Sequence, residues 1–123
     1  MHDPACRFCL SNNLLVDTPL ARLDRFYLLG SIETGRPAQA MIVPVRHIET
    51  PFELNAHEWA ELGTALEQAK SVLARFEPSG WTIGWNVGAV AGQEVFHAHL
   101  HVIARFDKEI TAGRGIHALF RSQ

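Results

Sequence analysis

The stretch that decides the fold is residues 97–103, which read His97-Ala98-His99-Leu100-His101-Val102-Ile103. Successive side chains of a β-strand point to opposite faces, so the three histidines would share one face. The other face would pack into a core, through Phe96, Ala98, Leu100, Val102 and Ala104. We therefore predict a strand over residues 95–106. Three imidazoles on one face favour either a metal site or an imidazole that acts as nucleophile or base.

The composition is that of a globular protein, and its 123 residues predict a single domain. Eleven Lys and Arg against 13 Asp and Glu give a net charge of −2, which argues against bulk electrostatic binding to nucleic acid. No apolar run approaches the roughly 20 residues of a membrane span, and the N-terminus does not resemble a signal peptide. We expect a cytoplasmic protein with neither a nucleic-acid nor a membrane partner.

One long helix is predicted over Asn55–Phe76. Asn55 suits the N-cap, and Glu58 three residues later completes a capping-box pattern. Apolar residues recur at intervals of three and four and predict one buried stripe: Trp59, Leu62, Leu66, Ala69, Leu73 and Phe76.

The remaining elements are predicted as strands and short turns. Strands are expected over 25–29, 38–45 and 81–87, in addition to the histidine strand. The glycine-rich turn at 88–92 favours an antiparallel hairpin between the last two strands. We also expect a turn or short helical piece over 4–12 and a short amphipathic end over 116–120, within a C-terminal tail of 107–123.

Cys6 and Cys9 form a single Cys-x-x-Cys near the N-terminus. In a cytosolic chain this spacing indicates metal ligation or redox chemistry more often than a structural disulfide. Its position, without a preceding strand, favours half of a zinc site, and the other two ligands must come from elsewhere.

Residues 92–103 resemble the signature of the histidine-triad (HIT) family of nucleotide hydrolases and transferases, in which three histidines alternate with apolar residues after Gly-Gln. Residues 41–48, with Pro44 and His47, resemble a second segment of that family. The resemblance covers almost all of residues 5–106. It implies an α+β fold: an antiparallel sheet of about five strands, one long helix, and a homodimer.

The resemblance also implies a reaction. His99 would attack the α-phosphorus of a nucleoside phosphoanhydride or phosphoramidate, with diadenosine polyphosphates among the candidates, and form a nucleotidyl-histidine that water hydrolyses. A neutral imidazole is a competent nucleophile near pH 7. His101 would contact a phosphate oxygen, Asn86 and Gln93 would help to bind the phosphate, and Ser31 aligns with the residue that holds the ribose.

Zinc-carrying members of the family imply the missing metal ligands. The four would be Cys6, Cys9, His47 and His97, a closed S₂N₂ set typical of a structural rather than a catalytic zinc site. No catalytic metal is then required. A second interpretation makes all three triad histidines ligands of a catalytic zinc and leaves both cysteines unused.

Two further alternatives stay open. The chain could be a non-catalytic purine-nucleotide-binding or adaptor module of the same fold, although an intact middle histidine argues against that. Arg105 could reach a distal phosphate or could be a surface charge.

Overall fold

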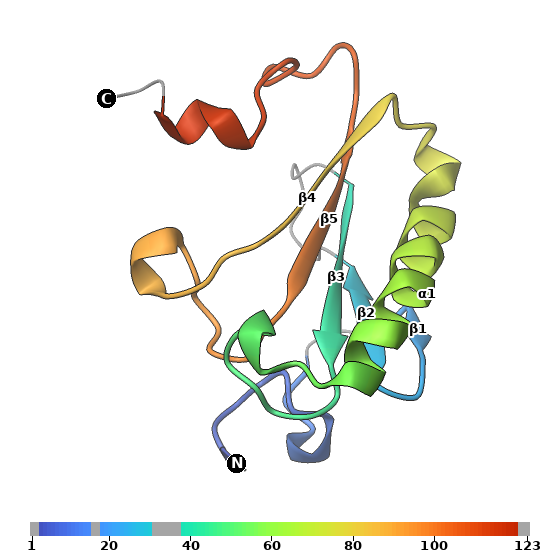
Figure 1. The fold of residues 1–123 in the computed structure, drawn as a ribbon. Helices are drawn as coiled ribbons and strands as arrows, with labels where there is room; N and C mark the ends of the chain where they lie inside the picture. Colours follow the sequence, from blue (N-terminus) through green and yellow to red (C-terminus); the bar gives the residue numbers. More distant parts are fainter. Residues whose placement is uncertain (1–2, 16–17, 31–37, 121–123) are drawn as a thin grey trace.

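The fold is an antiparallel five-stranded sheet with one long helix on one face (Figure 1), as predicted from the sequence. The structure is a computed structural model, and it describes residues 3–15, 18–30 and 38–120. The strand order is β1-β2-β3-β5-β4. The bounds are β1 (Ala21–Arg22), β2 (Phe26–Gly30), β3 (Gln39–Pro44), β4 (Gly80–Trp85) and β5 (Leu100–Arg105), with the helix α1 at Ala56–Leu73.

The two faces of the sheet bury different clusters because neighbouring residues of a strand point to opposite sides. Phe26 and Leu28 of β2 pack with α1 in the main core, whereas Tyr27 and Leu29 pack against the N-terminal segment. That second cluster contains Cys6, Phe8, Cys9, Tyr27, Leu29 and Val43. The N-terminal segment lies at the end of the sheet where β3 ends and β5 begins (Figure 1).

The helix begins as predicted. The side chain of Asn55 accepts a hydrogen bond from the backbone N–H of Glu58, whose carboxylate accepts one from the backbone N–H of Asn55, both at 2.9 Å. The buried stripe differs from the prediction. Its inward positions are 58, 62, 65, 69 and 73, so Trp59 is turned away and is 50% exposed. Phe76, in the 3-10 turn Ala74–Phe76 that follows, is 44% exposed.

The histidine strand is shorter than predicted, since β5 begins at Leu100 rather than at residue 95. The backbone N–H of Ala98 donates at 2.7 Å to the carbonyl of Ile48, in the loop after β3, instead of to a strand. Phe96, expected in the core, is 47% exposed. His97 and His99 therefore precede the strand, and His101 lies on it.

Other predicted elements are close to those observed. β4 and β5 form the expected antiparallel hairpin, with Gly84 opposite His101. The first predicted strand corresponds to β2 and the second to β3, while the short β1 was not predicted. The N-terminal piece is turns followed by a 3-10 helix at Leu10–Asn12, and another 3-10 helix covers Ile116–Phe120. Within the described residues, no helix is both long and apolar enough to cross a membrane.

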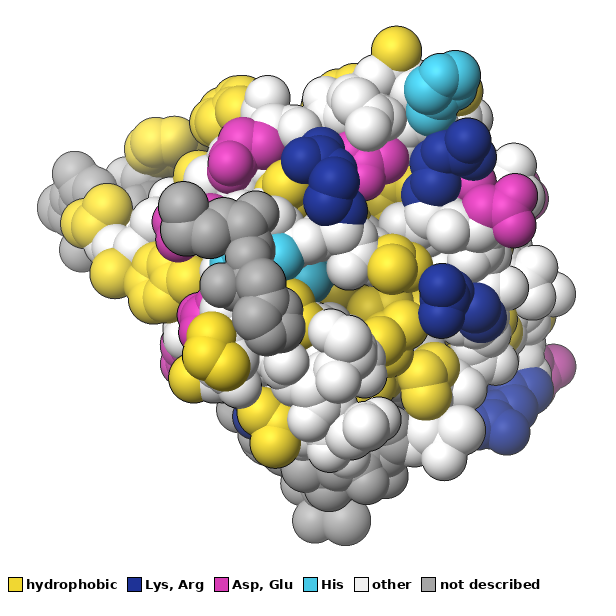
Figure 2. Space-filling model, turned by 90° about the horizontal axis from the view of Figure 1, so that it is seen from below, with side chains coloured by type: hydrophobic (Ala, Val, Ile, Leu, Met, Phe, Trp, Pro, Cys, Tyr) yellow, Lys and Arg dark blue, Asp and Glu magenta, His cyan; other side chains and the backbone are white. Residues whose placement is uncertain are grey.

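Charged side chains are interspersed on the face seen from below in Figure 2. Lys and Arg lie apart from one another there, and several lie beside Asp or Glu. Among the described residues on this face, the basic side chains do not form one extended patch.

Candidate metal centre and active site

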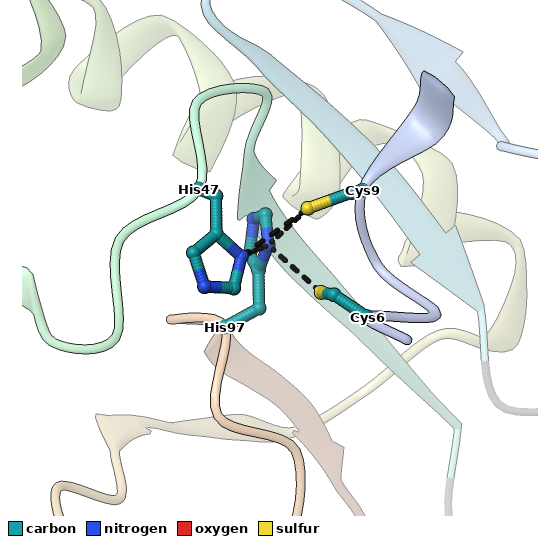
Figure 3. Close-up of side chains that lie close together, drawn as sticks. All are labelled: Cys6, Cys9, His47 and His97. Atoms are coloured by element: carbon teal, nitrogen blue, oxygen red, sulfur yellow. Dashed lines mark hydrogen bonds between the residues drawn. The ribbon is translucent and has the colours of Figure 1, made fainter. Parts of the chain in front are cut away.

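Four side chains from three separate segments converge on one point (Figure 3). Cys6 and Cys9 come from the N-terminal segment, His47 from the loop after β3, and His97 from the residues before β5. One donor atom of each lies within 4.8 Å of every other. Both cysteines and His97 are buried, and His47 is partly buried.

The spacing of these donors suits a tetrahedral zinc ion. Sγ of Cys9 lies 3.2 Å from Nδ1 of His47 and 3.5 Å from Nδ1 of His97. Sγ of Cys6 lies 3.4 Å from Nδ1 of His97. The two Nδ1 atoms are 3.2 Å apart. A tetrahedron with Zn–S near 2.3 Å and Zn–N near 2.0–2.1 Å has edges of roughly 3.3–3.8 Å. The donor set and these four distances therefore fit zinc, and the two remaining pairs of donors lie within 4.8 Å.

The orientation and protonation of His97 also suit a ligand. Its Nε2 lies 2.7 Å from the carbonyl of Pro44; a carbonyl only accepts, so Nε2 carries the hydrogen and Nδ1 presents its lone pair to the cluster. Burial lowers the pKa of His97 to about 4, although the hydrogen bond to the Pro44 carbonyl acts to raise it. Burial, followed by the hydrogen bond and charge of Cys6, raises the pKa of Cys9 to about 11. Metal binding at neutral pH must therefore displace a thiol proton.

The loop between the cysteines is anchored to the sheet. The buried hydroxyl of Tyr27 donates a hydrogen bond to the carbonyl of Phe8. The side-chain amide of Asn12 donates at 2.9 Å to the carbonyl of Cys6 and at 2.8 Å to that of Asp3. The loop therefore has a defined shape that directs both sulfur atoms to the cluster.

His99 lies beside this cluster but does not belong to it. Its Nδ1 donates at 2.8 Å to the backbone carbonyl of His97, which leaves Nε2 as the nitrogen with a free lone pair. The residue is 9% exposed. Burial lowers its pKa, although the hydrogen bond to the His97 carbonyl acts to raise it. The ring is therefore neutral at pH 7, as a nucleophile requires.

His101 follows on β5, its ring centroid 5.0 Å from that of His99, and burial lowers its pKa as well. Its cross-strand neighbours are Met41 on β3 and Gly84 on β4. A Cβ atom added to Gly84 would meet no heavy atom within 4 Å. Open space therefore lies over β4 next to His101.

Asn86 and Gln93 belong to the turn before the triad. Gly92 has φ of +99°, which favours glycine, and a Cβ there would lie 3.7 Å from the amide group of Asn86. The buried amide of Gln93 donates to the carbonyls of Glu49 and Val95 at 2.8 and 3.2 Å, and it accepts from the N–H of Gly88 at 2.8 Å. In this structure the Gln93 side chain therefore bonds to backbone.

Two other candidates from the sequence remain. Ser31 lies outside the described residues. Arg105 donates from Nε to Glu109, from Nη1 to Thr82 and from Nη2 to Thr111, each at 2.8 Å, so its guanidinium fixes the chain after β5.

Sequence reasoning missed Phe8, which is 4% exposed and packs edge-on against the rings of His97 and His99. Its position between the two cysteines was the available signal. It also missed the ion pair of Arg46 with Glu58, at 2.7 Å, which ties the residue before His47 to the start of α1.

Comparison with known proteins agrees with this architecture. Residues 17–108 match the family model described as the HIT domain, so the chain belongs to the HIT family. It is 32% identical over 121 residues to "Protein hit" of Bacillus subtilis, covering 95% of this chain and 79% of that protein. It is 30% identical over 89 residues to the AP-4-A phosphorylase of Mycobacterium tuberculosis, covering 71% of this chain and 46% of that protein.

A solved structure shares the fold. The zinc-bound histidine triad family protein of Mycobacterium smegmatis superimposes with a TM-score of 0.73 at 20% identity, covering 90% of this chain and 82% of that one.

Proposed function

We propose that this protein is a nucleotide hydrolase or nucleotidyl transferase that cleaves at the α-phosphate of a nucleoside phosphoanhydride or phosphoramidate through a covalent intermediate on His99. The observation that carries the proposal is the 2.8 Å hydrogen bond from Nδ1 of His99 to the His97 carbonyl, because it fixes a neutral nucleophilic tautomer. Membership of a family that includes a relative named as an AP-4-A phosphorylase supports the substrate class.

In the first step the lone pair of Nε2 forms a bond to the α-phosphorus. The bond from phosphorus to the leaving oxygen or nitrogen breaks, and the leaving group takes that electron pair and a proton from solvent. The imidazole becomes positively charged, and its Nδ1–H bond to the His97 carbonyl strengthens with that charge. Water, or an acceptor group in a transfer reaction, then attacks phosphorus and releases His99 with its lone pair restored. The water or acceptor that attacks in this second step returns one proton to solvent.

The other proposed roles concern the charge on the phosphoryl group, which must be met by donors. His101, 5.0 Å from His99 between ring centroids, would donate to a phosphate oxygen. Asn86 lies beside Gly92 at the turn before the triad, and its amide would donate to another phosphate oxygen. Gln93 would act through the shape of that turn, and Ser31 remains our proposal for the ribose contact.

We also propose that Cys6, Cys9, His47 and His97 hold a structural zinc ion. Four protein ligands would leave no open coordination position, so the ion would supply a cross-link between the N-terminal segment and the residues before β5. We expect the protein to work in the cytoplasm as a homodimer, which sedimentation of the purified protein would test.

The decisive variant for this proposal is His99→Ala. It should abolish turnover of a panel of nucleoside polyphosphates and phosphoramidates while the affinity for the mononucleotide product persists. His57→Ala changes an exposed helical histidine instead and should behave as the wild type. Near-normal turnover by His99→Ala would exclude the nucleophile. Nucleotide binding without turnover of any substrate in the wild type would favour a binding module.

A further inference from the structure

Phe8 joins the metal loop to the proposed nucleophile. It stands between Cys6 and Cys9, and its ring meets that of His99 edge-on, with centroids 5.1 Å apart and planes at 89°. It also meets His97 at 6.2 Å and 75°. Aromatic pairs in this range favour an edge-to-face arrangement and contribute about 0.5–1.5 kcal/mol beyond the burial of their area.

The backbone of Phe8 is held by a hydrogen bond while its ring is buried. Its carbonyl accepts a hydrogen bond from the Tyr27 hydroxyl. Cys6 lies two residues before Phe8 in the chain and Cys9 follows it directly, so both sulfur atoms of the cluster are close to Phe8 in sequence. A metal ion that binds both sulfurs therefore restricts the backbone of Phe8 from both ends.

With the residues that the structure describes, the imidazole of His99 makes one hydrogen bond, from Nδ1 to the His97 carbonyl. A single bond leaves the ring free to tilt about that nitrogen, and a tilt displaces Nε2, the atom proposed to attack phosphorus. A flat ring packed at 89° against the imidazole opposes this tilt. Small displacements of an attacking atom have large effects on rate.

We propose that Phe8 is a positioning residue that transmits the order of the Cys6–Cys9 loop to the imidazole plane of His99. The inference rests on the proposed function for its catalytic consequence, and the physical coupling between loop and ring stands separately. It assigns the metal centre an effect on His99 beyond cross-linking of the fold.

The test compares Phe8→Leu with the wild type and with Leu29→Ala. Leucine keeps an apolar side chain but removes the aromatic edge. Leu29 is 6% exposed in the same cluster and lies two strands from His101, so Leu29→Ala controls for general loosening of that cluster. Proteins labelled at histidine are loaded with zinc, and zinc content, imidazole NMR signals, kcat and the affinity for a mononucleotide are measured.

We expect Phe8→Leu to retain zinc and mononucleotide affinity, to shift and broaden the His99 ring signals, and to lower kcat by about 10- to 100-fold, as for other supporting residues. The signals of exposed His57 and His117 should not move. Leu29→Ala should leave the His99 signals and kcat close to wild type. Unchanged His99 signals in Phe8→Leu would overturn the inference.

A chelator tests the transmission from the metal. Zinc removal should shift the His99 signals of the wild type but add little in Phe8→Leu, since both changes act through the same contact. Equal chelator effects in both proteins would overturn the transmission. This arm requires no turnover, so it judges the coupling even if the proposed reaction fails.

Discussion

The backbone carbonyl of His97 accepts a hydrogen bond from Nδ1–H of His99 at 2.8 Å, while the side chain of His97 faces the two cysteines. A side-chain substitution at His97 removes a proposed metal ligand but keeps that acceptor. The proposed metal centre and the proposed nucleophile are therefore adjacent, and a substitution can remove the ligand side chain while it leaves the acceptor of His99 in place.

Substitution of the metal ligands should separate zinc from turnover. Cys9→Ser and His97→Ala should each lose the zinc and melt at a lower temperature, because a ligand is missing from a closed four-residue site. Both should keep part of the activity, since Nε2 of His99 and its hydrogen-bond acceptor remain. Metal analysis, thermal unfolding and turnover measure the three quantities.

His99→Ala provides the opposite pattern, with full zinc content and no turnover. If Cys9→Ser held as much zinc as the wild type, the ligand assignment would be wrong.

Glu58 should make stability depend on pH. Its carboxylate is 3% exposed, and although burial raises its pKa, hydrogen bonds from Arg46 and the Asn55 backbone outweigh that effect and lower it below the ordinary 4.5. The folded state then holds this proton less tightly than the unfolded chain. The contribution of Glu58 is therefore complete above pH 4.5 and declines as the pH falls through the lowered pKa of the folded state.

Glu58→Gln isolates that contribution, because its amide oxygen can still accept from Asn55 but its charge is gone. Denaturant unfolding from pH 7 to pH 3 should show the wild type losing its advantage over the variant toward the acid end. A constant difference across the range would refute the assignment.

The open space over Gly84 should admit substrate. Gly84→Val places a side chain beside His101, where nothing lies within 4 Å, and valine suits a strand, so the fold should persist. We expect KM to rise with a smaller effect on kcat. Gly80→Val is the matched control on the same strand and face, beside Arg105, where a Cβ also meets nothing. Equal KM values for the two variants would place the substrate elsewhere.

Gln93 should prove to be part of the scaffold. Its replacement by leucine leaves the carbonyls of Glu49 and Val95 and the N–H of Gly88 without their partner. These backbone groups are only partly buried, so Gln93→Leu should lower the free energy of unfolding by about 0.5–1.5 kcal/mol for each hydrogen bond lost. Denaturant unfolding measures it. Unchanged stability together with a raised KM would instead indicate a direct substrate contact.

Much of this architecture could be predicted because the signals were local. The Asn55–Glu58 capping box marked the start of α1, and the spacing of His97, His99 and His101 set the odd positions apart from Ala98, Leu100 and Val102 in the core. The structure also groups the four expected metal ligands, although the family resemblance rather than the spacing nominated two of them.

The errors have tertiary causes. The strand start at Leu100 depends on a bond from Ala98 to Ile48, fifty residues earlier, which no local pattern reveals. Trp59 is exposed because Glu58 takes the inward position of the first helical turn to reach Arg46. Phe8 was missed because contact with His99 is set by how the N-terminal segment docks on the sheet.

The most direct test of the central claim is to trap the covalent intermediate. The wild-type protein is mixed with a nucleoside polyphosphate or phosphoramidate, quenched within one turnover under conditions that preserve phosphorus–nitrogen bonds, digested and examined by mass spectrometry. We expect one added nucleotidyl group on the peptide that contains His99, and none in His99→Ala. Rapid turnover with an unmodified His99 peptide throughout, or an adduct on another residue, would contradict it.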